Sequence, residues 1–167
     1  MKKYIPLLTV SLLICLFIYV FYRTEKTLVN QFIMALLSKD RYHDLKTAIT
    51  TALPLKECIV YSLPEGLWVF CITITSGPFY LQFRKYKLRL VFIPILIAVG
   101  MEILQLIHFL NGRFDFMDIA FSIGFWLPAW LWTRDNAGGE SIFSSFDTKS
   151  ICCMLSYSIV YLAHVIY

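Results

Sequence analysis

The chain has 167 residues, of which 59% are hydrophobic and only 16% are charged, and its formal net charge is +4. About half of the residues in a soluble domain are apolar, so a hydrophobic content of 59% and a mean hydropathy of +0.68 argue against an ordinary soluble domain. The sequence predicts an all-α fold: a single domain over 1–167, built as a polytopic bundle of about five transmembrane helices with an amphipathic outer loop. The modest positive charge needs no nucleic acid partner to explain it.

Five apolar runs predict the spanning helices. They lie at 4–22, 66–83, 90–110, 116–132 and 151–167. About 20 residues of helix cross the hydrocarbon core, so the first four runs are credible spans and the fifth is short. No small-residue cleavage site follows the first run, which we interpret as a retained signal anchor.

The basic residues of the short loops predict the orientation. The loop at 84–89 holds four basic residues, whereas the loop at 111–115 holds only Arg113. Because short basic loops stay on the cytoplasmic side, we predict that the N-terminus is inside and that 111–115 lies outside. The long loop at 23–57 has six basic residues and would be outside, but long loops are weaker evidence.

That long loop contains a helical pattern of its own. Its apolar residues recur at helical spacing, namely Leu28, Val29, Phe32, Ile33, Leu36 and Leu37. A second short helix over 44–53 would end before Pro54. We expect this pair either to cap the bundle as a packing hairpin or to bind a partner.

A possible helix start and a possible kink flank the second run. Ser62 and Glu65 have the spacing of a capping box, with Pro64 in the first turn. Glu65 would then lie near the outer face, either as part of the cap or as part of a site. Gly77-Pro78 should kink the span.

Polar side chains interrupt the third run. Glu102, Gln105 and His108 follow at three-residue spacing and occupy neighbouring faces of one helix. Glu102 lies roughly 12 Å along the helix from Leu110 at 1.5 Å per residue, too deep to reach water. It therefore needs a partner, a cavity or a proton, either for function or as a buried pair. Gln105 can bridge helices, and we interpret His108 as interfacial and not as a metal ligand.

The next residues return the chain beside that helix. Asn111-Gly112 predicts a turn, and Asp118 then lies beside the preceding carboxylate, with Ser122 one turn deeper. Arg113 at the mouth can bridge Asp115 or Asp118. Two plainer interpretations stay open: Arg113 and Asp115 form a loop ion pair, or Asp118 caps its helix.

Four of these residues resemble the pattern of the VanZ-like membrane protein family: Glu102, Gln105, Arg113 and Asp118. The resemblance covers about 94–130. It implies a bacterial cytoplasmic (inner) membrane protein with an extracytoplasmic polar site, in a family linked to resistance to the glycopeptide teicoplanin. The chain departs from the family pattern at Ser122 and Gly124.

Other chemistry has no signature in the sequence. The five cysteines include no C-x-x-C pair and no cysteine–histidine spacing typical of a metal site. No phosphate loop, nucleophile elbow or dinucleotide fingerprint is present. We therefore predict no metal and no cofactor.

Three functions are compatible with the sequence, and whether the protein is an enzyme stays open. In the first, the protein binds or modifies an envelope component such as a lipid-linked glycan, with membrane lipids or an anionic head group as partners. Glu102 and Asp118 would then be an acid–base pair, with substrate contacts from Arg113, Gln105, Asp115, His108 and Glu65. In the second, a small proton-coupled transporter carries its proton on Glu102. In the third, a non-catalytic assembly factor uses the cluster only to lock the hairpin.

Overall fold

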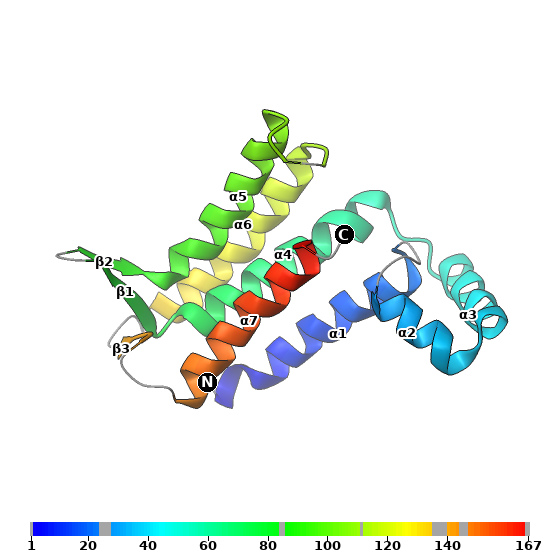
Figure 1. Ribbon diagram of the computed structural model, residues 1–167, viewed down its shortest axis with the longest axis horizontal. Helices are drawn as coiled ribbons and strands as arrows, with labels where there is room; N and C mark the ends of the chain where they lie inside the picture. The colour runs from blue at the N-terminus through cyan, green and yellow to red at the C-terminus, as the bar shows by residue number, and fades with distance from the viewer. Residues whose placement is uncertain are drawn as a thin grey trace.

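The computed structural model describes residues 2–23, 28–83, 86–110, 112–134, 140–143 and 147–165. Within these ranges the fold is mostly helical (Figure 1). The helices are α1 (Ile5–Phe21), α2 (Leu28–Leu37), α3 (Lys39–Ala52), α4 (Glu57–Ser76), α5 (Ile93–Leu106), α6 (Phe116–Thr133) and α7 (Thr148–Val165), with single 3-10 turns at Lys2–Tyr4 and Leu90–Phe92. The strands are β1 (Phe79–Phe83), β2 (Tyr86–Arg89) and β3 (Glu140–Ser141).

The chain runs back and forth between two ends of the molecule. Gly66 in α4 meets Phe125 of α6, and Gly77, directly after α4, meets Thr133 of α6, so these two helices run in the same direction. Helices α1, α5 and α7 run the opposite way (Figure 1). The strands and the N-terminus therefore lie at one end, the sheet end. The loop between α5 and α6 lies at the other, the hairpin end.

Helix α4 lies at the centre of the fold and contacts α1, α6 and α7. Its apolar side chains are buried, with Val69, Ile72 and Ile74 at most 1% exposed. It is the one helix in the described part of the chain that is long and apolar enough to cross a membrane. The apolar helices Ile5–Phe21 and Leu90–Leu106 are shorter. The predicted bundle of five spans is thus confirmed only as a mostly helical fold with one clear candidate span.

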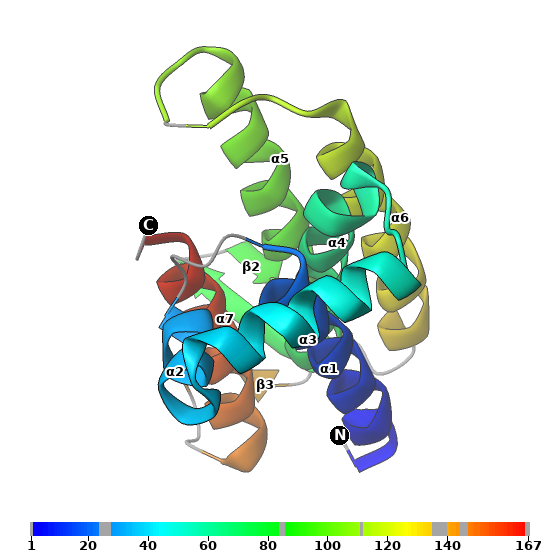
Figure 2. The ribbon, with the colours of Figure 1, turned by 90° about the vertical axis from the view of Figure 1, so that its right-hand side faces the viewer.

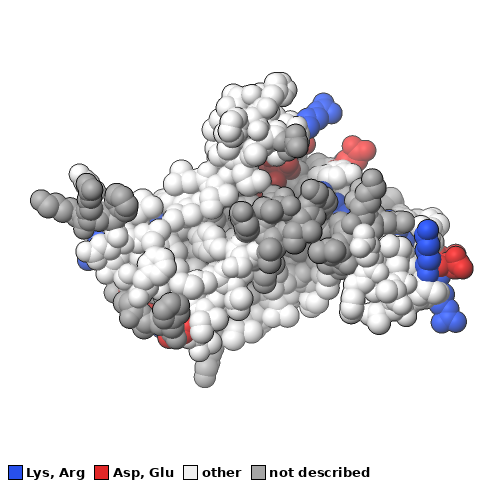
Figure 3. All heavy atoms as spheres, viewed as in Figure 1, with Lys and Arg blue, Asp and Glu red and all other residues white. Residues whose placement is uncertain are grey.

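The outer surface is unusually apolar around its middle. Figure 3 shows mostly uncharged atoms there, with the charged side chains gathered toward the ends and beside the α5–α6 hairpin. Helix α1 alone exposes Ile5, Val10, Leu12, Leu13, Ile14, Leu16 and Phe17. Large apolar patches of this kind mark a surface that lipid or a partner covers.

The predicted second span, 66–83, has the wrong bounds. Helix α4 begins at Glu57 and ends at Ser76. Gly77-Pro78 ends the helix instead of kinking it, because proline has no amide hydrogen to continue the hydrogen-bond pattern. The chain then enters β1.

A small sheet corrects the prediction of an all-α fold. Strand β1 pairs antiparallel with β2, placing Leu81 opposite Leu88, and parallel with β3, placing Tyr80 opposite Ser141. Apolar side chains pack where the sheet meets α7: Phe79, Leu90, Ile142 and Cys153. The sequence placed β1 in the predicted span 66–83 and β2 in the loop 84–89, because strands of two to five residues carry little pattern of their own.

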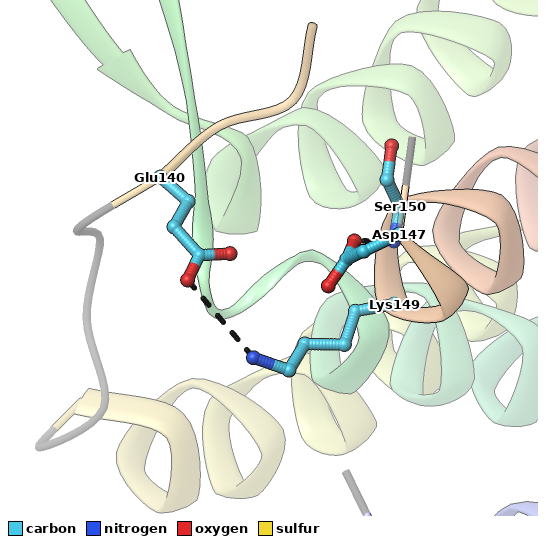
Figure 4. A network of polar contacts seen from close by, with 4 residues as sticks. All are labelled: Glu140, Asp147, Lys149 and Ser150. Carbon is cyan, nitrogen blue, oxygen red and sulfur yellow. Dashed lines mark hydrogen bonds and ion pairs between the residues drawn. The ribbon is translucent and has the colours of Figure 1, made fainter. Parts of the chain in front are cut away.

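Polar contacts connect the sheet to the start of α7 (Figure 4). The Ser150 backbone N–H donates to Asp147 Oδ1 at 3.0 Å, which caps the helix. The Ser150 hydroxyl donates to the Ile142 carbonyl at 3.0 Å, and Lys149 Nζ lies 4.0 Å from Glu140 Oε1. This cap sets where α7 begins, a few residues before the predicted 151–167; residues 166 and 167 lie outside the described chain.

The predicted helix pair of the first long loop is present, but α3 begins at Lys39 and not at the predicted 44. Helices α2 and α3 lie across the end of α1 (Figure 2). The Tyr42 hydroxyl donates to the Val20 carbonyl at 2.6 Å, and Lys46 Nζ donates to the Arg23 carbonyl at 3.2 Å. These bonds hold the end of α1 in place, together with Arg23, which follows the helix.

Helices α5 and α6 form the predicted antiparallel hairpin, with a longer connection than predicted. Helix α5 ends at Leu106, before the predicted end at 110, while α6 covers the predicted run at 116–132. The connection at 107–115 leaves room for several polar groups at the hairpin end.

Candidate functional site

Three carboxylates from three helices meet near the hairpin end. Glu65 of α4, Glu102 of α5 and Asp118 of α6 each place an oxygen within 4.8 Å of the other two. Glu102 is only 3% exposed, and the other two are partly buried. We call these residues the carboxylate cluster. The predicted approach of Asp118 to Glu102 is found, and Glu65 joins them.

Glu102 has a hydrogen-bond partner across the hairpin. The Asp115 backbone N–H donates to Glu102 Oε2 at 2.9 Å. The Asp115 side chain accepts from the Met117 N–H at 2.9 Å and so caps α6. The alternative in which Asp118 caps this helix is therefore wrong. Asp118 lies in the first turn, where its side chain can face the cluster.

Two buried serines border the cluster. The Ser62 hydroxyl lies beside Asp118 and the Ser122 hydroxyl lies beside Glu65. Both residues are fully buried, yet neither Oγ, nor Asp118 Oδ1, has a hydrogen-bond partner in the described structure. The predicted capping box is wrong, because Ser62 lies inside α4. The predicted position of Ser122, one turn below Asp118, is confirmed.

Arg23 is the cation that the sequence analysis missed. Its guanidinium interacts electrostatically with the Glu65 and Asp118 carboxylates, although no direct ion pair joins these described residues. It lies 5.1 Å from the centre of the Tyr19 ring and 4.7 Å from that of Tyr61, and Nη2 donates to the Tyr61 carbonyl at 3.3 Å. One feature of the sequence could have pointed to Arg23, since this arginine directly follows an apolar run rich in aromatic residues.

Arg113 has a more peripheral position than predicted. It is exposed, and in the described structure it forms no ion pair with Asp115 or Asp118. Instead it lines a pocket of about 550 Å³ together with Tyr61, Phe114, Asp115 and Asp118. We call this the polar pocket. The predicted bridge is thus not formed, but Arg113 faces the same space as Asp118.

Gln105 and His108 lie outside the carboxylate cluster. The Gln105 side chain packs beneath Gly112, where a Cβ would lie 2.8 Å from Nε2, and Gly112 has φ +139°. His108 is exposed, has φ +57° and donates its backbone N–H to the Gln105 carbonyl at 3.0 Å. This left-handed conformation ends α5. Both residues therefore shape the loop; Asn111 lies outside the described residues.

The structure also contains a separate apolar cavity, which Tyr19 helps to line. It has a volume of about 350 Å³ between α1, α4 and α7. Its lining includes Leu8, Leu12, Cys15, Tyr19, Pro64 and Trp68. Tyr19 lines this apolar cavity and Tyr61 lines the polar pocket, and the Arg23 guanidinium lies over both rings. One guanidinium thus contacts a ring from the lining of each space.

No protein family matches the chain, and no curated protein or solved structure is similar to it. The resemblance to VanZ-like proteins rests on the four quoted residues alone. The functional argument below therefore depends on the geometry of this site.

Proposed function

We propose that the protein is a VanZ-like protein of the bacterial inner membrane whose outward-facing site binds or modifies an envelope component. The component we favour is an amphiphile with an anionic head group, such as a lipid-linked glycan. The observation that carries this proposal is the contact of Arg23 with two rings, Tyr19 from the lining of the apolar cavity and Tyr61 from that of the polar pocket. An amphiphile needs both kinds of space and a cation where they meet.

The membrane location is supported by the surface and by the path of the chain. Exposed apolar side chains surround α1 and the middle of the molecule. The back-and-forth path gathers the N-terminus and the basic strand β2, with Lys87 and Arg89, at the sheet end (Figure 1). With basic loops inside, the sheet end faces the cytoplasm and the hairpin end faces outward.

Recognition of the head group falls to Arg113 and Arg23. Arg113 lines the polar pocket with an exposed guanidinium, and arginine binds phosphate through paired hydrogen bonds. The hydrocarbon chain would enter the apolar cavity along Trp68. Its volume of about 350 Å³ is in the usual range for small-molecule sites.

A chemical step on the bound component would use Asp118 and Glu102. The Asp115 amide occupies one oxygen of Glu102, whereas Asp118 keeps an oxygen without a hydrogen-bond partner and lines the polar pocket. Two carboxylates in different environments can divide the roles of acid and base. We assign proton transfer to and from the substrate to Asp118. Glu102 would then act on Asp118 only through its nearby charge.

The alternatives receive different support. A transporter needs a polar path toward the sheet end, and on that side of Glu102 helix α5 buries the apolar residues Pro94 and Ala98. One observation favours a non-catalytic assembly factor: the hydrogen bond from the Asp115 N–H to Glu102 stabilises the α5–α6 hairpin without any ligand.

Binding of a short-chain polyprenyl diphosphate to the full chain in detergent tests the proposal. Trp68 fluorescence reports occupancy of the apolar cavity, and a Trp68→Phe variant identifies its share of the signal. We expect saturable binding that weakens several-fold in Arg113→Gln. A neutral polyprenol of equal length is the control. Equal binding of both compounds, or binding of neither, would refute an anionic amphiphile.

A further inference from the structure

We infer that the carboxylate cluster is a binding site for a hard divalent cation of the Ca²⁺, Mn²⁺ or Mg²⁺ class. The direct ligands are oxygens of Glu65, Glu102 and Asp118, and the Ser62 and Ser122 hydroxyls border the site. The sequence analysis predicted no metal because it examined cysteine and histidine spacing. Here the ligands come from three helices and have no local spacing pattern.

The geometry of the oxygens fits such an ion. Ca²⁺ binds oxygens at about 2.3–2.6 Å, so two ligands on opposite sides of it lie about 4.6–5.2 Å apart. The three carboxylates place oxygens within 4.8 Å of one another, so one ion can contact all three. Mg²⁺, with ligands at about 2.0–2.1 Å, requires oxygens slightly closer together, so Ca²⁺ fits this spacing better.

The serines provide independent evidence for a ligand at this place. Ser62 of α4 and Ser122 of α6 are 0% exposed; Ser62 interacts with Asp118 and Ser122 with Glu65, but neither hydroxyl makes a well-aligned hydrogen bond. Asp118 Oδ1 is also buried without a partner. Buried polar groups are nearly always paired, because an unpaired one loses its hydrogen bonds to water without replacement. Three such atoms around one small volume indicate a missing polar species.

The charges in this region also favour a cation. When all three carboxyl groups are ionised they carry −3, and Arg23 contributes +1 nearby. Close like charges repel one another, and burial makes this repulsion stronger. A divalent ion brings the sum of −3, +1 and +2 to zero. The exposed Asp115 side chain is already used to cap α6 and adds no ligand.

The cation would give the acidic site a way to hold an anionic head group. Divalent ions in proteins often bind through one or two carboxylates together with substrate phosphates. Asp118 belongs both to the carboxylate cluster and to the polar pocket, so an ion there reaches the space where the head group would lie. This role rests on the proposed function, whereas the cation site itself does not.

Isothermal titration calorimetry of the full chain in detergent tests the site. The protein is stripped with EDTA and titrated separately with CaCl₂, MnCl₂ and MgCl₂. We expect saturable binding of at least one ion with about one ion per chain. Asp118→Asn and Glu65→Gln should each weaken binding by roughly 10- to 100-fold. Glu57→Gln, which removes an exposed carboxylate from the same helix as Glu65, should leave it unchanged.

A second variant keeps the test decisive if a carboxylate substitution disrupts folding. Ser62→Ala removes one bordering hydroxyl at little structural cost, and it should weaken binding by roughly tenfold. Mn²⁺ bound to wild-type protein should also lose its free-ion electron paramagnetic resonance signal. Absence of binding to folded wild-type protein, or equal binding in wild type and Asp118→Asn, would overturn the cation site.

The two proposals can fail separately. Cation binding without any binding of polyprenyl diphosphate refutes the amphiphile and leaves the cation site standing. Polyprenyl diphosphate binding that is unchanged by EDTA, in a protein that binds no ion, refutes the cation site and leaves the amphiphile standing.

Discussion

The backbone N–H of Asp115 donates a hydrogen bond to Glu102 Oε2 at 2.9 Å, and this bond joins the loop of the α5–α6 hairpin to a buried carboxylate. The two residues are 13 positions apart in the chain. The bond explains how a glutamate that is 3% exposed is tolerated on an apolar helix. It also fixes the entrance to the polar pocket, since Asp115 lines that pocket.

Glu102→Ala should destabilise the hairpin, whereas Glu102→Gln should not. Alanine leaves the Asp115 N–H without its acceptor, which costs about 1–3 kcal/mol, while glutamine keeps a carbonyl oxygen there. The free energy of unfolding in mixed micelles measures the difference. If the residue is functional, Glu102→Gln keeps this stability and loses ligand binding. Retained binding in Glu102→Gln would favour the lock of an assembly factor.

Asp115→Ala should weaken the start of α6. The Asp115 side chain accepts the Met117 N–H at 2.9 Å, and loss of such a cap costs about 1 kcal/mol. Asp115→Asn retains an acceptor and should cost much less. The unfolding free energy of each variant checks this. An equal loss of unfolding free energy in both variants would show that Asp115 stabilises the helix through its charge and not through capping.

Arg23→Lys should be damaging although it keeps the positive charge. The planar guanidinium lies over the Tyr19 and Tyr61 rings, and lysine cannot reproduce that stacking together with the bond to the Tyr61 carbonyl. We expect a lower unfolding temperature and weaker ligand binding. Arg113→Lys, at an exposed position, should leave the unfolding temperature unchanged. Identical unfolding temperatures in the two variants would contradict the structural role of Arg23.

Gly66→Val should separate α4 from α6. A Cβ at Gly66 would lie 2.6 Å from Phe125 Cδ2 and 3.1 Å from the Phe121 carbonyl oxygen. Overpacking of this kind costs about 1–3 kcal/mol, and the displaced helix would carry Glu65 away from the cluster. The matched control is Gly124→Val on α6, because a Cβ there meets no atom within 4 Å. If the two variants lose equal stability, close α4–α6 packing is not the cause.

Local patterns predicted the helices well, including α2, α3 and α6. They failed at 77–89, because short strands carry little periodic signal and Gly77-Pro78 is compatible with either a kink or a helix end. They also misplaced the start of α4: Ser62 and Glu65 match a capping box, but the helix begins earlier, at Glu57, and contains both residues.

The candidate site was predicted in part, for a similar reason. Glu102, Asp118 and Ser122 lie on one hairpin, so helical spacing was enough to bring them together. Arg23 lies far from them in the sequence and reaches the cluster only because α1 packs against α4. Such tertiary proximity leaves no trace in local spacing, and the same is true of the Asp115 amide that pairs with Glu102.

The most direct test of the central claim, an outward-facing site, is the sidedness of the two ends. In a background with all five cysteines replaced by alanine, Phe109→Cys marks the hairpin end and Tyr86→Cys marks the sheet end; the native side chains are 76% and 80% exposed. Intact cells are treated with a membrane-impermeant thiol reagent. We predict labelling at position 109 before lysis and at position 86 only afterwards. The reverse pattern, or equal labelling of both in intact cells, would contradict the claim.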